Sequence, residues 1–301
     1  YTSAAAYDKK DAGQAGDVGS DDQPLTIDLI GAGAQLGGEV AGSLFLREWD
    51  GDLVVGRLTA SGSAVLATVL GSILGTDLGG VANLRAAEVR LDAAHGGIGS
   101  LLGDALLIRT AKLSAIADGA PVGDEALPLG ILIDLQQQGM TTVEALTLTL
   151  ADGELDGATV ALSARGDLLI AGEVTTGGAA LSLAARGTLT QSVDGTIDTQ
   201  GGALAITTTR GSIVQQTAIE NGKGSLSQPS QRSSVITTGG GSVVLDAGDA
   251  IHLSQIDASG EGGAGTVALI ARTGSVIDNG QTIRLGTVDL DTDPDVIGSD
   301  L

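Results

Sequence analysis

Apolar and polar residues alternate at every second position in a short module that recurs through the second half of the chain. Each copy has a glycine, a small residue, alternating aliphatic residues, a second glycine and another aliphatic residue. The copies span 157–168, 178–189, 202–213, 241–251 and 265–276. Alternation at period two predicts a β-strand with one buried face, followed at the second glycine by a corner. We expect this glycine to adopt a backbone conformation that other residues resist.

The spacing of the corner glycines predicts how the strands are arranged. Gly166, Gly187, Gly211, Gly248 and Gly274 are separated by 21, 24, 37 and 26 residues, and the widest gap holds an insertion at 228–234. This period is typical of a solenoid. The predicted fold is therefore all-β, an elongated parallel β-helix with irregular coils of roughly 20–26 residues.

In a stack of coils, equivalent residues lie above one another in columns. The number of coils then predicts the length of the rod, and the alternating positions predict its core. Roughly 22 residues per coil give about 12 coils and, at about 4.8 Å per coil, a rod of about 60 Å. The alternating positions expected to point inward are Leu181, Leu183, Leu204, Ile206, Val267 and Leu269.

A longer repeat is also predicted, and it defines the expected domain organisation. The spacing of Val89, Leu91 and Asp92 before Ile98-Gly99-Ser100 is matched by the segment from Val288 to Ser299. Residues 1–17 are a polar lead-in, and 18–301 form one continuous solenoid. This solenoid would contain large repeat units at 18–97 and 98–296 and the start of a third unit at 297.

Composition narrows the function classes. The 301 residues include 48 Gly, no Cys and only four aromatic residues, and the net charge is −22. Strong acidity argues against binding to nucleic acid or to an anionic membrane surface, since both need basic patches. The core must be aliphatic, and neither disulfides nor Cys-type zinc sites are available. The most apolar stretch, 63–84, is interrupted by glycines and Asp77 and is a poor membrane span.

Four alternating carboxylates near the end of the sequence form a candidate calcium site: Asp289, Asp291, Asp293 and Asp295. In the long-repeat alignment Asp291 matches Asp92, whereas Asp293 and Asp295 match Ala94 and Gly96. A helix-loop-helix calcium loop also needs a glycine at its sixth position, which Pro294 and Val296 do not provide. A structural turn is therefore favoured over a metal ligand set, and no cofactor is expected other than calcium.

Three further motifs have structural interpretations. Gly31-x-Gly33-x3-Gly37 imitates a nucleotide-binding turn, but more glycines follow where a helix would be needed. The tripeptide Arg165-Gly166-Asp167 belongs to a corner pattern that recurs at Arg186 and Arg210, so we expect an arginine ladder along one edge. The two histidines, His95 and His252, fall on different coils and are expected to act separately.

The segments GGIGS, ALLI and GILIDLQQQGMTTVEAL, together with GTVALIARTGSVIDNG, resemble the repeats of filamentous-haemagglutinin-like bacterial surface proteins. The resemblance covers about 18–301. It implies a right-handed parallel β-helix that is exported and displayed at the cell surface as a shaft.

The expected function is thus a non-catalytic shaft or stalk of an extracellular bacterial adhesin or surface filament. The alternatives are a polysaccharide-binding or polysaccharide-degrading β-helix and a calcium-stiffened surface module. Expected partners are further copies joined end to end or flanking repeats of a longer chain, and a surface glycan or a host receptor is also possible. Neither nucleic acid nor direct membrane insertion is expected.

Overall fold

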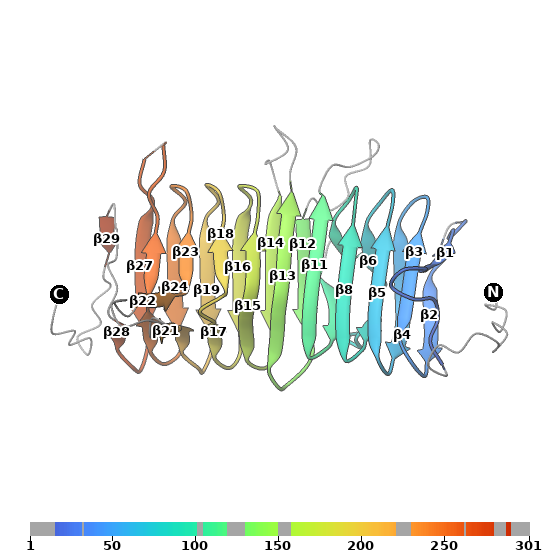
Figure 1. Cartoon of the computed structure of the whole chain (residues 1–301), viewed down its shortest axis with the longest axis horizontal. Coiled ribbons are helices and arrows are strands. Elements are labelled where there is room, and N and C mark those ends of the chain that lie inside the picture. Colours follow the sequence, from blue (N-terminus) through green and yellow to red (C-terminus); the bar gives the residue numbers. More distant parts are fainter. Residues whose placement is uncertain are drawn as a thin grey trace, which may run out of the picture.

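The computed structural model describes residues 16–31, 33–100, 105–118, 130–149, 158–220, 230–261, 263–279 and 287–289. These residues contain strands and no helix. The strands form two parallel sheets that face each other across a narrow core, and successive coils stack along the long axis of the molecule (Figure 1). The predicted all-β solenoid is therefore confirmed.

Sheet A contains one long path of strands and a shorter branch. The path is β1 (Leu25–Ile27), β3 (Leu44–Glu48), β5 (Ser63–Thr68), β8 (Glu88–Ala93), β11 (Lys112–Asp118), β13 (Thr141–Thr149), β15 (Leu168–Thr175), β17 (Leu189–Gln191), β20 (Ile213–Gln215), β25 (Ile251–Leu253) and β28 (Val276–Asp278). The branch leaves β15 and consists of β18 (Thr196–Asp198), β23 (Val235–Thr237) and β26 (Gln255–Asp257).

Sheet B lies on the opposite side of the core. Its strands are β2 (Leu36–Val40), β4 (Leu53–Ala60), β6 (Ile73–Gly75), β7 (Leu84–Arg85), β9 (Ile98–Ser100), β10 (Leu106–Arg109), β12 (Gly130–Leu135), β14 (Thr159–Ala164), β16 (Ala180–Ala185), β19 (Leu204–Thr208), β24 (Val243–Ala247), β27 (Thr266–Ala271) and β29 (Thr287–Asp289).

The coils are longer and fewer than the sequence suggested. Leu168 pairs with Leu189, one coil of 21 residues, whereas Leu113 pairs with Val143, a coil of 30 residues. The described part of the chain forms about nine turns, so the prediction of about 12 coils is wrong. At about 4.8 Å per turn, the stacked part extends about 45 Å, compared with about 60 Å predicted.

The predicted core columns are confirmed. Register pairs Leu181 with Leu204 and Leu183 with Ile206, and the columns continue to Val267 and Leu269 in β27. All six predicted side chains are buried. The buried apolar core of the described residues contains only Leu, Ile, Val and Ala, so each layer has small side chains that fit the narrow space between the sheets.

The corner glycines are needed for a different reason from the one expected. None of Gly166, Gly187, Gly211, Gly248 and Gly274 has positive φ. A β-carbon added to Gly166 would lie closer than 3.0 Å to the Gly139 carbonyl oxygen of the preceding coil. Glycine is required here because the backbones of neighbouring coils approach closely, and not because of an unusual backbone conformation.

At the opposite corner, where the chain passes from sheet A to sheet B, glycine is needed because the backbone has positive φ. Gly177 and Gly178 have φ of 56° and 96°. The buried hydroxyl of Thr176 donates to the Ala179 carbonyl at 2.7 Å and closes the turn. Thr199 and Thr238 repeat this contact in the next two coils, which makes a buried threonine column that the sequence analysis did not anticipate.

The long repeat does not correspond to a structural repeat. Val89 lies in β8 of sheet A, whereas Val288 lies in β29 of sheet B. The aligned positions therefore lie on opposite sides of the core, and the repeating unit in the structure is the single coil. The alignment of Asp291 with Asp92 consequently gives no information about a metal site.

Truncation of one core residue tests the columns. Leu183→Ala should lower the free energy of unfolding by about 2–5 kcal/mol, because it leaves a cavity between two coils. Ser182→Ala, at the neighbouring outward position, should change it by less than about 0.5 kcal/mol. Chemical denaturation of both variants would measure the difference, and equal effects would contradict the assigned register.

Two glycines at the same corner test the close-approach argument. Gly166→Ala should destabilise the fold by about 1–3 kcal/mol through overpacking against the Gly139 backbone. A β-carbon on Gly139 meets only the Gln137 Nε2 atom at 3.7 Å, so Gly139→Ala should be close to neutral or slightly stabilising. A similar thermal shift for both variants would show that conformation, and not space, selects glycine at Gly166.

Candidate functional site

A shallow crevice of about 120 Å³ lies on the outer face of sheet A among the first coils. Its floor is formed by outward residues of three neighbouring strands, Phe45 of β3, Val65 of β5 and Arg90 of β8, which lie side by side in register. Ser20 and Asp21, from the segment before β1, line one side. This segment first pairs with the edge of β3, where the amide of Val18 donates to Ser43 O and that of Phe45 donates to Val18 O. Asp21 then reaches over the outer face to Arg90 of β8 and so bounds the crevice.

The crevice combines an apolar floor with opposite charges. Arg90 Nη1 lies 3.7 Å from Asp21 Oδ1, and both side chains are more than half exposed. Arg47 makes no ion pair with any described residue. A free guanidinium can bind a carboxylate or another oxygen-rich group, and the ring of Phe45 offers an apolar surface beside it. Because Asp21 and Asp92 also line the crevice, an acidic group of a small polar ligand has a cationic partner only on the side of Arg47.

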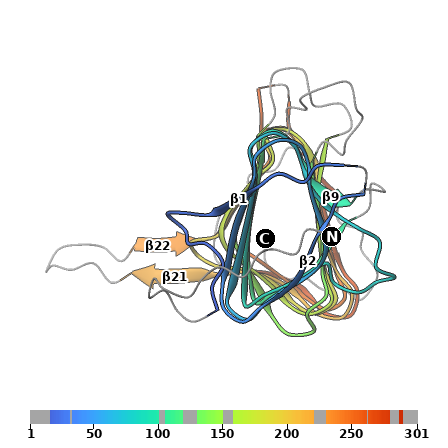
Figure 2. The same cartoon turned by 90° about the vertical axis from the view of Figure 1, so that its right-hand side faces the viewer.

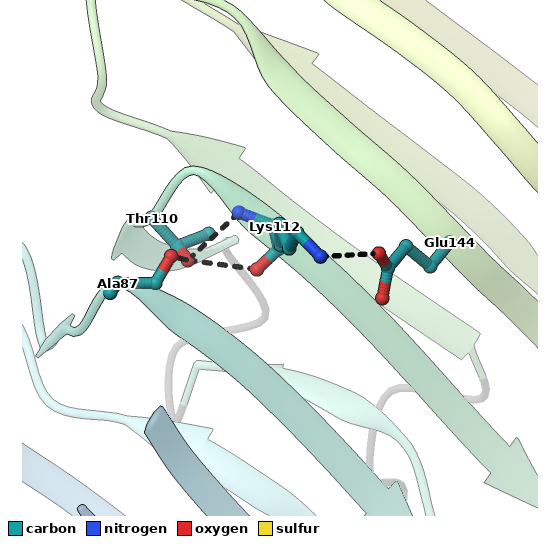
Figure 3. Close-up of polar contacts among 4 residues, drawn as sticks. All are labelled: Ala87, Thr110, Lys112 and Glu144. Atoms are coloured by element: carbon teal, nitrogen blue, oxygen red, sulfur yellow. Dashed lines mark hydrogen bonds and ion pairs between the residues drawn. The ribbon is translucent and has the colours of Figure 1, made fainter. Parts of the chain in front are cut away.

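A second polar cluster lies further along the same face, at the beginning of β11 (Figure 3). Lys112 Nζ lies 3.0 Å from Glu144 Oε1, and the Thr110 hydroxyl donates to the carbonyls of Ala87 and Lys112 at 3.1 and 2.8 Å. The hydrogen bond to Glu144 and the charges of Glu144 and Glu88 raise the pKa of Lys112. Lys112 is thus held protonated, which is the opposite of what a general base requires.

The inward-pointing Glu48 is the one buried carboxylate of the described core. Its Oε1 accepts the Leu29 amide at 3.0 Å, while its Oε2 has no partner among the described residues. Burial raises the pKa of Glu48, backbone hydrogen bonds from Leu29 and Asp50 offset part of this effect, and the negative charges of Asp28 and Asp50 add to it. The folded protein therefore disfavours the charged form of Glu48 relative to an exposed glutamate.

A polar seam replaces the aliphatic column where the strands of sheet A become short. Gln191 and Gln215 are buried in adjacent coils, and Gln215 Nε2 donates to Gln191 Oε1 at 3.0 Å. Gln215 Oε1 accepts the Ser254 amide, so the seam continues into the next coil. The hydroxyls of Ser234 and Ser254 are buried without a partner among the described residues. These amides fasten the coils together at the point where the backbone ladder is interrupted.

A hairpin projects sideways from the solenoid at this seam. Antiparallel strands β21 (Thr217–Glu220) and β22 (Ser230–Ser233) leave and re-enter the coil between β20 and β23, and Figure 2 shows them pointing away from the stacked sheets. Arg232 of β22 forms an ion pair with Asp194 of the preceding coil. The hairpin accounts for the widest gap between corner glycines, where the sequence predicted an insertion.

The candidate calcium ligands are only partly covered by the structure. Asp289 lies in β29, where its backbone pairs with Ala268 of β27. Asp291, Asp293 and Asp295 lie outside the described residues. Within the described ranges, no three His, Cys, Asp or Glu side chains are grouped closely enough to hold a metal ion.

The predicted arginine ladder is confirmed as a shared corner, but only Arg165 and Arg186 are in register, because Arg210 lies one residue further along and faces Gly187. Arg165, Arg186 and Arg210 are exposed at the same corner of successive coils. The amide of Arg186 bonds to the Ala164 carbonyl, and that of Arg210 bonds to the Arg186 carbonyl. The tripeptide beginning at Arg165 is therefore part of this corner.

The structure also gives the positions of the two histidines and of the glycine-rich turn. His95 is exposed after β8 and His252 lies in β25, so the two histidines are on different coils as expected. Gly31 and Gly33 have positive φ, and the chain continues to the strand β2 with no helix following them. A helix N-terminus for a nucleotide pyrophosphate is thus missing at this described turn.

Comparisons with known proteins found no match among family models, curated proteins or solved structures. No helix in the described part of the chain is long and apolar enough to cross a membrane.

Several polar residues of the interior were not found from the sequence. Glu48, Gln191 and Gln215 occupy alternating positions that elsewhere hold aliphatic residues, so their period-two spacing was the available signal. The crevice carried no local signal, because it depends on where the segment before β1 crosses the sheet.

Replacement of Glu48 by glutamine tests the buried acid. A raised folded-state pKa means that the stability contributed by protonated Glu48 is present below about pH 4.3, the ordinary glutamate value, and is lost as the pH rises through the raised pKa. Glu48→Gln should therefore stabilise the protein at neutral pH and flatten this decline. Melting temperatures measured from pH 4 to pH 8 would check it, with the exposed Glu173→Gln as the matched control. An unchanged pH profile in Glu48→Gln would contradict the assignment.

Proposed function

We propose that this chain is a shaft segment of an extracellular bacterial adhesin or surface filament, where it acts as a spacer rather than a catalyst. The observation that carries the proposal is the continuous stack of aliphatic columns from β3 to β27. Each coil contacts its neighbours along its whole length, so stiffness along the axis comes from the stack and needs no separate domain contacts.

The inter-coil contacts suit a load-bearing role. Parallel ladders join each coil to the next on both sheets, for example β14 to β16 and β15 to β17. Tension along the axis therefore acts on many backbone hydrogen bonds at once. The glutamine seam adds side-chain hydrogen bonds between coils where the sheet A strands are shortest.

The surface chemistry is consistent with an exposed position outside the cell. The net charge of −22 disfavours adsorption of the rod to acidic cell surfaces. The absence of cysteine leaves the fold insensitive to redox conditions, because every stabilising contact of the core is non-covalent. The resemblance to filamentous-haemagglutinin-like repeats supports the same role and cell-surface location.

A second candidate function is binding of an acidic saccharide or a similar small ligand, and the crevice beside Arg47 favours it. The two functions differ in where they reside. A spacer function is distributed over the coils, whereas ligand binding depends on Arg47, Phe45 and Arg90. A panel of acidic and neutral polysaccharides, tested for binding and for depolymerisation with wild type and Arg47→Ala, distinguishes them.

Deletion of one whole turn tests the spacer proposal. Removing residues 168–188 places Leu189 where Leu168 was, because these two residues are register partners. The shortened protein should keep a cooperative thermal transition and lose about 4.8 Å of length in small-angle X-ray scattering. In single-molecule stretching it should resist force as the intact chain does.

The matched control removes half a turn. Deleting 168–178 removes β15 but keeps β16, so two strands of sheet B are joined with no chain to cross sheet A. This variant should lose the cooperative transition. A whole-turn deletion that unfolds the protein, or cleavage of a polysaccharide by the intact chain, would contradict the shaft proposal.

A further inference from the structure

We propose that the outer face of sheet B, over strands β12 to β27, is a lateral pairing surface that binds the same face of a second copy of this chain. The inference goes beyond the spacer role, because it concerns how rods join side by side. It rests on three properties of the described strands: the distribution of charge, the flatness of the face and its area.

The first property is the near absence of charge. The six strands β12, β14, β16, β19, β24 and β27 contain two charged residues, Asp134 and Asp246. Their remaining outward positions carry Ala, Ser, Thr, Leu, Val and Ile. In a chain with 37 acidic residues, such a depletion marks the one broad side on which two copies can meet with little repulsion.

Both acids on this face already have partners. Asp134 accepts the Ser163 hydroxyl at 2.9 Å and the Gln136 amide at 2.5 Å. Asp246 is bound by two nitrogens of Arg272, at 2.8 and 2.5 Å. Because their oxygens are bonded within the face, these carboxylates need less solvation from water than free acids do.

Sheet A over the same coils has the opposite character. Its strands carry Glu144, Glu173, Asp198 and Asp257, and the hairpin β21–β22 projects beside it. Two copies approaching through sheet A would bring like charges together. Pairing of two copies is therefore opposed by charge repulsion on sheet A and not on sheet B.

The second property is the flatness of the sheet B face. Its centre is made of short side chains, including Ser182, Ala184, Ala205 and Thr207. Continuous register from β12 to β27 keeps these residues in straight rows. Two such faces can approach at about the 10 Å separation of packed sheets.

The third property is size. Six strands about 4.8 Å apart, each with about six residues at about 3.3 Å, cover about 600 Å². Two faces would bury about 1,200 Å² together, at the lower end of the range for specific interfaces. A face that complements itself suits a two-fold axis, in which the same residues contribute from both copies. The expected product is a reversible dimer that strengthens as salt screens the net charge.

A pair of single-charge variants tests the proposal. Ser182→Glu places a carboxylate at the centre of the face, and Thr196→Glu places one on the exposed outer side of sheet A in a neighbouring coil. Analytical ultracentrifugation over a concentration series, at low and high salt, should show wild type and Thr196→Glu forming dimers. Ser182→Glu should weaken dimerisation at least tenfold, because the two-fold axis brings two added charges together.

A cross-link identifies the face directly, since the natural chain contains no cysteine. With a short bis-maleimide, Ser182→Cys should give a covalent dimer and Thr196→Cys should give none. Circular dichroism of each variant confirms that it is folded. A wild type that stays monomeric at high concentration and high salt would overturn the proposal. So would association that both glutamate variants retain, as end-to-end contact predicts, or cross-linking through Thr196→Cys alone.

Discussion

The alignment of each coil on the one before it is the constraint on which the rest of the structure depends. Parallel pairing fixes the separation of neighbouring backbones at about 4.8 Å, and this spacing repeats on both sheets. A side chain that points inward must therefore fit directly against the equivalent residue of the next coil. Leu181 and Leu204 satisfy this condition in the core, and Gly166 satisfies it at the corner, where the neighbouring backbone leaves no room for a β-carbon.

The same constraint produces both the internal polar contacts and the contrast between the two outer faces. Because residues repeat in columns, a buried glutamine can hydrogen-bond to a glutamine at the equivalent position of the next coil. Gln191 and Gln215 do so. On the outside, rows of Ser, Ala and Thr give sheet B a side with little charge over β12 to β27, while sheet A carries carboxylates over the same coils. The chemistry of each side is set by entire rows, so the properties of the solenoid follow from its faces more than from any single residue.

The sequence was sufficient to predict structure where the pattern lies within one short segment. Alternation around Leu181 and Leu183 predicted strands, burial and columns, because a period of two has one structural meaning in a short segment. It was insufficient where two structures share that pattern. Strands of sheet A and sheet B have the same alternation, so Val89 and Val288 could be aligned although they lie in different sheets. The crevice beside Arg47 depends on the path of the segment before β1. Alternation places Glu48 inward, but its hydrogen bond from the Leu29 amide depends on a contact between separate coils that alternation does not encode.

The hairpin formed by β21 and β22 has a consequence for how such a chain can change during evolution. It enters the coil after Gln215 and returns before Val235, yet Ile213 still pairs with Ile251 and Ile236 with Ile256. Strands β21 and β22 lie beside the stack, and the pairing of the flanking strands is unbroken. Solenoids of this kind can thus acquire new segments at a break between two short strands without altering any neighbouring coil. At such a break, a rod of similar coils can acquire one segment that differs from the rest. The same position is suitable for grafting a recognition loop.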